Sequence, residues 1–473
     1  FIAQANFYQR LYEVTNLPEH QMKQVEALEK RKGVFFRDQV EAKWWESTQN
    51  LSEELRAEEA KLDQLIQAIS GEINSLLQEF EYLSGPDQER AIEKQNRLND
   101  QYAQAIMDRQ QWEYKIRNEN PHYRWKNFQF TESRLADVQR YLNPEMAFIS
   151  YYVTDNGFVT YALVTAQNGL EYEVIGNIAS FEEDLDALVE AIQNPNSNKS
   201  EFLARSSTLG KALLPILPFT VKRLIICPDG ALSRIPFAAL LSADALADAP
   251  WAVQPFWGMQ WGLSYTLSPS VWVSSMERQM PDDLDWSMAV FSGAKGSQAD
   301  QYFTETAAQR RLHVWQGEQA TIAEFTEQAR LETPILHLVS HGISVEEGQL
   351  GYLELKDGLE RISYPDLFRM EVNKDLLFLG GCGSGIGLYH SGEGYLSMSR
   401  GAIFAGADNV IVAKVSIETE SNGLFVASFY EELWEKPLPV TYAFAVQKAQ
   451  RALLNQPKSS HPYYWAGYYL EGR

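Results

Sequence analysis

The first third of the chain repeats its apolar residues with a helical period. An apolar residue recurs every seven positions at Leu55, Leu62, Ile69, Leu76 and Leu83. A second apolar position of the same repeat is filled by Ile66, Ile73 and Phe80. Two apolar positions per seven residues are typical of a coiled coil. Another helical pattern follows the breakers at residues 84–87 and stops before Pro121, so we expect an antiparallel coiled-coil hairpin within a helical region over residues 1–145.

From residue 146 the pattern changes to short runs rich in β-branched and aromatic residues. We expect strands over residues 146–153, 158–164 and 170–175. They are joined at Asn156-Gly157 and Asn168-Gly169, and Asn-Gly between such runs favours a tight hairpin turn. Helices are predicted over residues 181–193 and 201–214, and the run over residues 223–230 is predicted to be a buried strand that enters a turn. An α/β half over residues 146–285 follows from this order.

Beyond a polar stretch near residue 282, strands and helices alternate regularly. The expected strands are residues 287–291, 335–339, 376–379 and 409–413. The expected helices are residues 320–330, 364–370, 395–405, 423–434 and 440–455. This alternation predicts a second α/β half over residues 286–473, with a mainly parallel sheet covered by helices on both faces.

Two of these strands end at a reactive side chain among glycines. One apolar run ends at His341-Gly342, and another ends at Gly381-Cys382-Gly383. The carboxyl ends of parallel strands share one edge of a sheet, where ligands bind, so His341 and Cys382 are candidates for one site. A free thiol, with a pKa of about 8.5, needs a base or a donor-rich turn to become a nucleophile at neutral pH. His341 could serve as that base, and the backbone N–H groups of Gly342 and Cys382 could form an oxyanion hole.

Other chemistries fit these residues poorly. The glycines after residue 379 match neither a dinucleotide-binding fingerprint nor a phosphate-binding loop, and Ser384 lacks the glycine two residues before it that a serine nucleophile elbow requires. His337 and His341 have the spacing of a zinc peptidase but lack its glutamate. We therefore expect no metal and no organic cofactor. The residues alone leave open a buried cysteine and a hydrogen-bonded histidine without a catalytic role.

Charge and cysteine content narrow the class of protein further. The 473 residues carry 41 basic and 63 acidic side chains, a net charge of −22, which disfavours binding to nucleic acid and to anionic membranes. The two cysteines, Cys227 and Cys382, are too few for a disulfide framework, and Cys227 inside a predicted strand is expected to be structural.

No apolar run is long enough to span a bilayer, so a cytoplasmic location is expected. The chain begins without Met, which leaves open whether it is a fragment of a longer protein.

From residue 146 onward the chain resembles the CHAT domain, a caspase-like cysteine peptidase family of the caspase/separase clan. The matching segments, in the family's order, are residues 227–230, 235–240, 263–273, 335–342, 376–385, 392–394, 405–407 and 461–466. The resemblance implies a catalytic dyad of His341 and Cys382. It also implies that residues 146–285 form a degenerate caspase-like half without a dyad.

Some positions depart from the family's pattern. The family usually has Ser-Ala-Cys-Glu-Thr-Gly where this chain has residues 380–385, so an acidic neighbour of the nucleophile is missing. By the resemblance Glu418 could meet a basic side chain of a substrate. Gly381, Gly383, Ser384 and His390 are further candidates for substrate binding, with loop residues as the alternative.

The resulting hypothesis is a cysteine endopeptidase that cuts a protein partner and is activated through the helical arm or an upstream repeat domain. By resemblance, bacterial defence or cell death is the expected setting. The alternative is a catalytically idle caspase-like scaffold that binds partners without cutting them.

Overall fold

The computed structural model describes residues 135–473 with short gaps, together with residues 18–32 and scattered earlier positions. The gaps are residues 155–156, 278–286, 295, 308, 332, 344–351, 364–365, 368–369, 382, 386–387, 391–393, 416–417 and 436–440. The scattered positions are residues 5 and 8 and parts of the segment 57–108. Contacts divide the chain into two compact units, Phe1–Phe128 and Gln129–Arg473. The predicted boundary at residue 145 falls inside the second unit, and the proposed boundary between residues 285 and 286 stays a prediction.

In the first unit, helix α2 spans Pro18–Arg31 and buries Val25, Ala27 and Leu28. Of the predicted seven-residue repeat, Leu62, Ile69 and Leu76 belong to the described residues; all three are helical, and the last two are buried. The repeat positions Leu55, Ile66, Ile73, Phe80 and Leu83 lie outside the described residues. The coiled-coil hairpin therefore stays a prediction.

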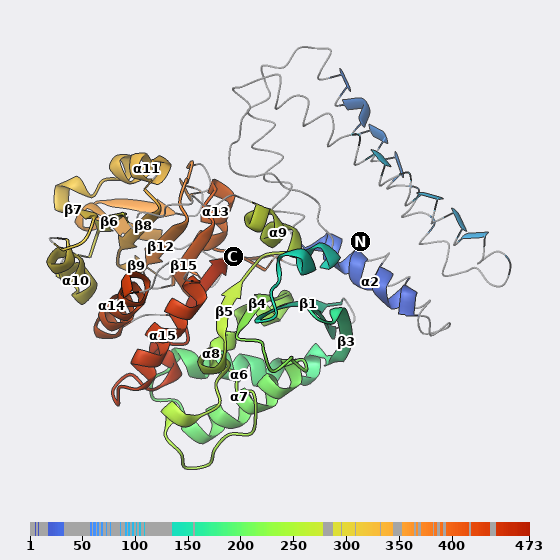
Figure 1. Ribbon diagram of the computed structural model, residues 1–473, viewed down its shortest axis with the longest axis horizontal. Coiled ribbons are helices and arrows are strands. Elements are labelled where there is room, and N and C mark those ends of the chain that lie inside the picture. The colour runs from blue at the N-terminus through green and yellow to red at the C-terminus, as the bar shows by residue number, and fades with distance from the viewer. Residues whose placement is uncertain are drawn as a thin grey trace. The chain divides into compact units, whose positions relative to one another are not determined.

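The second unit is built on one sheet of 11 strands (Figure 1), in the order β3-β2-β1-β4-β5-β16-β15-β12-β8-β6-β7. Its strands are β1 Met146–Val153, β2 Phe158–Thr165, β3 Gly169–Asn177, β4 Arg223–Cys227, β5 Gly262–Tyr265, β6 Met288–Ser292, β7 Leu312–Gln316, β8 Ile335–Val339, β12 Leu376–Gly380, β15 Asn409–Ala413 and β16 Tyr468–Gly472. Neighbours are parallel except at β1–β2, β2–β3 and β15–β16. The predicted mainly parallel α/β sheet is confirmed.

Strand β16 joins the two predicted halves and reverses the direction of the sheet. It pairs in parallel with β5 of residues 146–285, and antiparallel with β15 of residues 286–473. Because β4 and β5 are parallel to β16, they run opposite to β15, β12, β8, β6 and β7. The parallel strands of the two halves therefore run in opposite directions within one continuous sheet. Their carboxyl ends lie on opposite sides of the sheet, measured along the strands.

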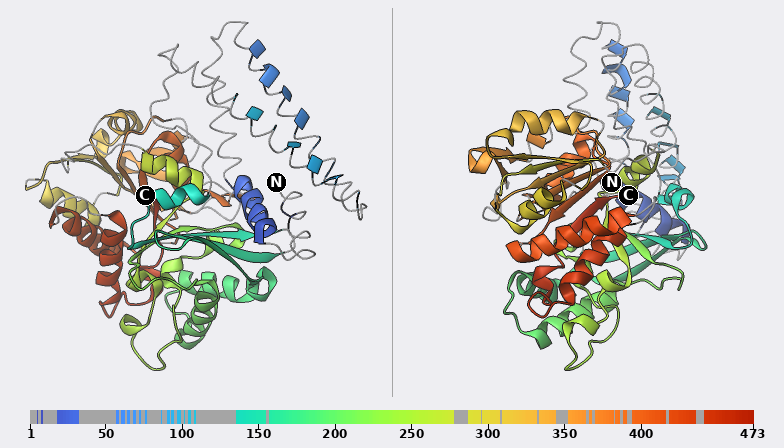
Figure 2. Two further views of the ribbon diagram at one scale, coloured as in Figure 1. Left: turned by 45° about the vertical axis from the view of Figure 1, so that its right-hand side comes forward. Right: turned by 60° about the vertical axis from the view of Figure 1, so that its left-hand side comes forward.

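Helices cover both faces of the sheet, as a sheet of continuously apolar strands requires. Figures 1 and 2 show α9, α11 and α13 on one face, and α10, α14 and α15 on the other, with α6 to α8 beside the first half. Their bounds are α6 Glu182–Gln193, α7 Lys199–Leu213, α8 Trp257–Gln260, α9 Pro269–Glu277, α10 Gln298–Thr306, α11 Ile322–Arg330, α13 Met398–Ala405, α14 Thr419–Glu435 and α15 Tyr442–Leu454.

Two small sheets lie outside the main one, and one of them corrects a sequence prediction. Strands β9 (Gly342–Ile343), β10 (Tyr352–Leu355) and β11 (Glu360–Ser363) form a three-stranded sheet. Strands β13 (Leu388–His390) and β14 (Gly394–Leu396) form a hairpin. The prediction of a helix from residue 395 was wrong at its start, because α13 begins only after Ser397, whose hydroxyl caps it by accepting the N–H of Arg400.

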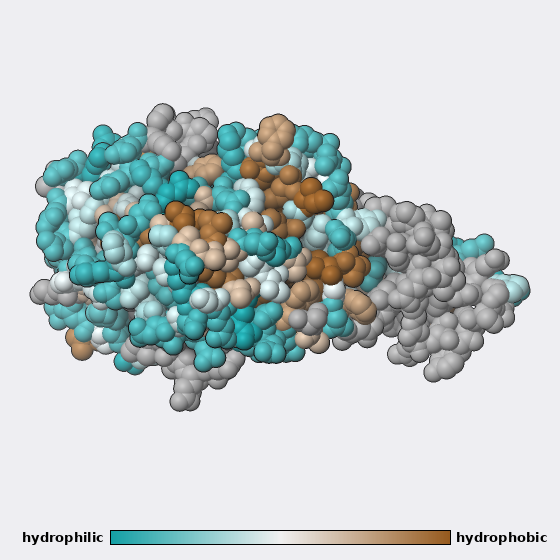
Figure 3. Space-filling view, turned by 90° about the horizontal axis from the view of Figure 1, so that it is seen from below, coloured by the Kyte–Doolittle hydropathy of each residue, from teal (hydrophilic) through white to brown (hydrophobic). Residues whose placement is uncertain are grey.

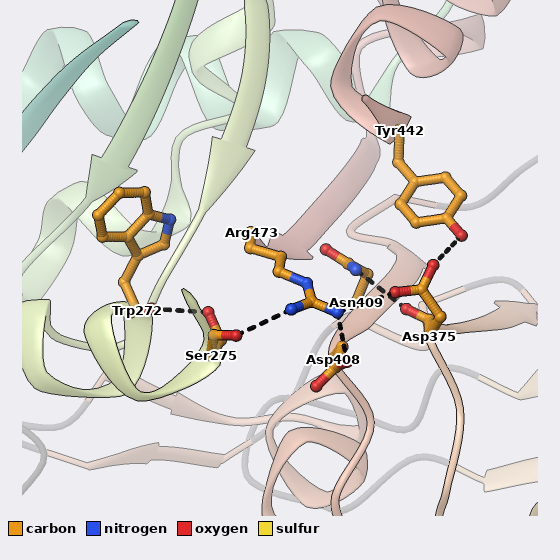
Figure 4. A network of polar contacts seen from close by, with 7 residues as sticks. All are labelled: Trp272, Ser275, Asp375, Asp408, Asn409, Tyr442 and Arg473. Atoms are coloured by element: carbon orange, nitrogen blue, oxygen red, sulfur yellow. Dashed lines mark hydrogen bonds and ion pairs between the residues drawn. The ribbon is translucent and has the colours of Figure 1, made fainter. Parts of the chain in front are cut away.

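A buried ion-pair network ties the two halves together at β16 (Figure 4). The guanidinium of Arg473 lies 3.1 Å from Asp375 Oδ1 and 2.6 Å from Asp408 Oδ2, both in the second half. It also donates to the backbone oxygen of Ser275 in α9 of the first half, at 3.0 Å. Tyr442 of α15 donates to the other oxygen of Asp375. Arg473 thus binds two carboxylates of the second half and one backbone carbonyl of the first half.

The surface of the described part carries few large apolar side chains. The most exposed are Ile216 and Phe219, between α7 and β4. On the face shown in Figure 3, hydrophobic residues form separate patches with hydrophilic residues between them. Among the described residues, no helix combines the length and apolarity needed to cross a membrane.

Candidate functional site

The two strands predicted to carry reactive side chains are neighbours in the sheet. Strands β8 and β12 pair in parallel over their whole length, with Ile335 opposite Leu376 and Val339 opposite Gly380. The pairing continues one step further, because the N–H of Ser340 donates to the oxygen of Gly380 at 3.2 Å. His341 comes next and is exposed. An imidazole therefore stands at the carboxyl edge of the sheet, where the main chain of β8 leaves it.

Ser340 fixes the main chain beside His341. Its buried hydroxyl lies 2.9 Å from the oxygen of His341 and 2.9 Å from that of Glu354, and it accepts the N–H of Glu354 at 2.7 Å. This hydroxyl connects the end of β8 to strand β10. Sequence reasoning missed Ser340, although a small polar residue directly after a buried strand was a usable signal.

The turn after β12 is anchored to the next strand, β15. The N–H of Gly383 donates to the oxygen of Val415 at 3.4 Å, and that of Gly385 donates to Ala413 at 2.8 Å. Buried Ser384 adds two bonds: its hydroxyl donates to the oxygen of Leu379 at 2.9 Å and accepts the N–H of Ala413 at 3.0 Å. The hydroxyl of Ser384 thus holds two strands together, and its role in substrate binding stays a prediction.

Glycine is required at two positions of this turn for different reasons. Gly383 has a φ of +66°, a left-handed conformation that other residues adopt only with strain. At Gly380 a Cβ atom would lie 3.0 Å from the oxygen of Leu338 and 3.2 Å from Nε2 of His337. The glycine run therefore meets a conformational need and a close approach to β8.

The other predicted site residues fall at several places. Cys382 lies outside the residues that the structure describes. Gly342 belongs to β9 and pairs with Leu353, and His390 ends β13 opposite Gly394. The exposed Glu418 precedes α14, and its carboxylate accepts the N–H and the hydroxyl of Ser421 at 2.9 and 2.8 Å. Glu418 caps a helix, and the catalytic and substrate-binding roles of all these residues stay predictions.

His337, four residues before His341, has a different environment. It is fully buried, and its Nδ1 lies 2.8 Å from the hydroxyl of Tyr430 in α14. The rings of Phe303 and Phe378 pack on it with centroids 4.8 and 4.2 Å away. Burial lowers its pKa to about 3, so the imidazole is neutral. Among the described residues, no three His, Cys, Asp or Glu side chains are grouped as a metal site would require.

The fold belongs to the caspase-like class. Separase, in the Saccharomyces cerevisiae separase–securin complex, has a similar structure with a TM-score of 0.50 at 10% identity, over 88% of this chain and 37% of that one. Our chain thus spans little more than a third of the separase chain. The Porphyromonas gingivalis RgpB pro- and mature domains match at a TM-score of 0.40 and 12% identity, over 62% of this chain and 76% of that one.

The family model of the CHAT domain matches residues 203–473, more than half of the chain. The chain therefore belongs to the CHAT domain family, as the sequence resemblance indicated. No curated protein matches the chain.

Proposed function

We propose that the chain is a cysteine endopeptidase that cuts a protein partner with Cys382 as nucleophile and His341 as general base and acid. One observation carries the proposal. Paired residues of β8 and β12 differ by 41 in number, as 335 and 376 do, and His341 and Cys382 differ by the same amount. In the sequence, His341 and Cys382 thus each come two positions after one of two paired strand ends, and the carboxyl ends of such parallel strands are where open α/β sheets bind ligands.

The reaction uses groups of this chain alone. His341 takes the proton of the Cys382 thiol, and the thiolate attacks the carbonyl carbon of the scissile peptide bond. The C–N bond breaks as His341 returns the proton to the leaving amine, and a thioester remains on Cys382. Water, deprotonated by His341, then attacks the thioester and releases the acid and the thiol. Backbone N–H groups of Gly342 and Cys382 would stabilise the oxyanion, each by about 3 to 4 kcal/mol.

Other features favour a protein as the substrate. Exposed Glu418 follows β15 at the same edge of the sheet, and with His390 it is our candidate for contacts with the substrate. The net charge of −22 favours basic partners over nucleic acid. We expect activation by a regulatory protein bound through the helical arm or an upstream repeat domain. Bacterial defence or cell death remains our suggested setting.

The test is cleavage of a mixed peptide library, followed by mass spectrometry of the new termini. We expect cleavage by the wild type and by Cys227→Ala, a loss of about 10³-fold or more in Cys382→Ala, and a loss of about 10²- to 10⁴-fold in His341→Ala. A peptide probe with a thiol-reactive end group should label Cys382 in the wild type. Equal cleavage by a folded Cys382→Ala would refute the peptidase proposal. No labelling and no cleavage, with or without a bound partner, would favour the idle scaffold.

A further inference from the structure

Lys414 directly follows β15, beside the turn that carries the predicted nucleophile. Its stem packs on that turn, because a Cβ atom at Gly385 would lie 3.1 Å from Lys414 Cγ. The residues on either side of it accept the N–H groups of this turn: Ala413 that of Gly385, and Val415 that of Gly383. Gly383 is covalently bonded to residue 382. Lys414 thus lies between the two residues whose backbone oxygens hold the turn Gly383–Gly385 in place.

The other end of the Lys414 side chain is held by the first half. Its ammonium donates to the backbone oxygen of Ser233 at 2.6 Å and lies 3.9 Å from the ring centroid of Tyr469. Ser233 belongs to the short helical turn Gly230–Arg234 that follows β4, and Tyr469 of β16 stacks on Tyr265 of β5. A cation over an aromatic face and a charge-assisted bond to a carbonyl are both strengthened where water is excluded.

The half-buried position of this cation is unfavourable unless its contacts compensate. Burial lowers the pKa of Lys414 to about 8, against the opposing effect of the buried Glu471 carboxylate. A neutral residue of similar length would fill the same space without this cost. The lysine therefore supplies what an apolar stem does not: a donor that reaches the carbonyl of Ser233, 181 residues earlier in the chain.

We propose that Lys414 is a positioning residue that couples the turn Gly230–Arg234 of the first half to the turn Gly383–Gly385 of the second half. The proposal rests on the proposed function, which makes the second turn part of the catalytic site. It gives the first half, which the family resemblance treats as degenerate, a defined task. A partner that shifts the turn Gly230–Arg234 would change the support of residues 383–385, and through it the activity.

Hydrogen exchange of the peptide that contains Gly383 and Gly385 tests the coupling, whether or not the protein cleaves anything. Lys414→Met keeps an unbranched stem but removes the donor, and we expect exchange there to rise by about tenfold or more. Lys414→Arg keeps charge and donor and should stay within about threefold of the wild type. Lys211→Met, which removes an exposed lysine paired with Asp244, is the matched control and should leave this peptide unchanged. If Lys414→Met does not fold, Lys414→Gln takes its place.

A double-mutant cycle tests the link to the first half. Asp229 holds the start of the turn Gly230–Arg234, because its carboxylate accepts the N–H of Val153 at 2.9 Å. We expect Asp229→Ala to raise exchange at residues 383–385, and to add less than about twofold once Lys414 is already methionine. Full additivity of the two effects would overturn the coupling, as would Lys414→Met within about twofold of the wild type, or Lys414→Arg as fast as Lys414→Met.

Catalysis provides a readout that separates this inference from the proposed function. If the wild type cleaves peptides, Lys414→Met should lower kcat at least about fivefold with KM within about twofold, because a misplaced turn affects the reaction more than binding. An unchanged kcat would overturn the positioning role while leaving the peptidase intact. If the wild type never cleaves, the exchange results still decide whether Lys414 couples the two turns.

Discussion

The two halves of the second unit end their parallel strands in contrasting ways. In the first half, β4 ends at Cys227, a buried thiol whose Sγ lies 3.4 Å from the oxygen of Leu267. Asp229 then uses its carboxylate to hold the N–H of Val153, so this edge is closed by its own contacts. In the second half, β8 ends at Val339, two residues before the exposed His341, and β12 is followed by a buried glycine turn. The same strand-and-turn plan thus leaves the thiol of Cys227 buried in one half and the imidazole of His341 exposed in the other.

The direction of the strands explains why the halves do not share a site. Because β16 is antiparallel to β15, the carboxyl ends of β4 and β12 lie at opposite edges of the sheet. Cys227 and His341 therefore lie at opposite ends of the strands and cannot form one site. A thiol at the end of a strand therefore indicates chemistry only if a base ends a neighbouring parallel strand.

The largest expected effect is the difference in peptide cleavage between a variant of His341 and a variant of Cys227. His341→Ala should lower the rate of peptide cleavage by about 10²- to 10⁴-fold, the usual contribution of a general base. Its thermal midpoint should stay close to that of the wild type, because His341 is exposed. Cys227→Ala should leave cleavage within about twofold while lowering stability through lost packing. Initial rates and thermal unfolding measure both, and comparable activity losses in the two variants would contradict the contrast between the edges.

The next effect tests whether the halves unfold as one. Arg473→Met should destabilise the protein by about 3 to 5 kcal/mol, because it leaves the buried Asp375 and the partly buried Asp408 without their cation. Urea unfolding followed by tryptophan fluorescence and by circular dichroism gives the value. The control is Arg330→Met, which breaks an exposed pair with Glu327 and should cost less than about 1 kcal/mol. If the two halves of the wild type unfold in separate transitions, the contacts of Arg473 do not make them one cooperative unit.

A smaller effect, of about 1.4 kcal/mol per pH unit, comes from two buried histidines of the second half, one packed within that half and one packed against the first half. The pKa of His337 is lowered to about 3 by its burial among second-half residues. The pKa of His461 is lowered to about 4 by burial against Phe202 and Trp251 of the first half. In the unfolded chain each imidazole is protonated below about pH 6.5, whereas in the folded protein it stays neutral to a lower pH. The free energy of unfolding therefore falls as pH decreases below about 6.5.

His337→Phe should remove about 1.4 kcal/mol per pH unit from this slope between about pH 6.5 and pH 4. His461→Phe should flatten it in the same direction. Urea unfolding at several pH values gives the slopes, which are independent of any constant loss from the substitution. A slope unchanged in both variants would show that neither imidazole stays neutral in the folded protein.

The smallest effect compares buried serine hydroxyls in the two halves. Ser384→Ala removes the bonds to Leu379 and Ala413, and Ser206→Ala removes a 2.7 Å bond to Ala239 in the first half. Each should cost about 1 kcal/mol of unfolding free energy. Only Ser384→Ala should also slow cleavage, by severalfold, because it loosens the turn after β12. Equal cleavage rates in both variants would show that this turn tolerates movement.

Much of the candidate site could be predicted because its signals are local. The apolar run Ile335–Val339 was placed with its correct bounds, and β12 was placed to within one residue. The prediction that both strands lie in a mainly parallel sheet follows from apolar runs that alternate with helical patterns. The family resemblance, confirmed by the match over residues 203–473, rests on the same local segments.

The sequence by itself determined which strands are buried, which side chains end them, and that a histidine and a cysteine follow two such strands. Only the tertiary structure decided that β8 and β12 are direct neighbours, that β16 reverses the sheet, and that Ser340, Ser384 and Lys414 hold the edge. The reason is physical. Hydrophobic period and turn residues act over a few positions, whereas strand order, strand direction and side-chain ties depend on contacts between residues far apart in the chain.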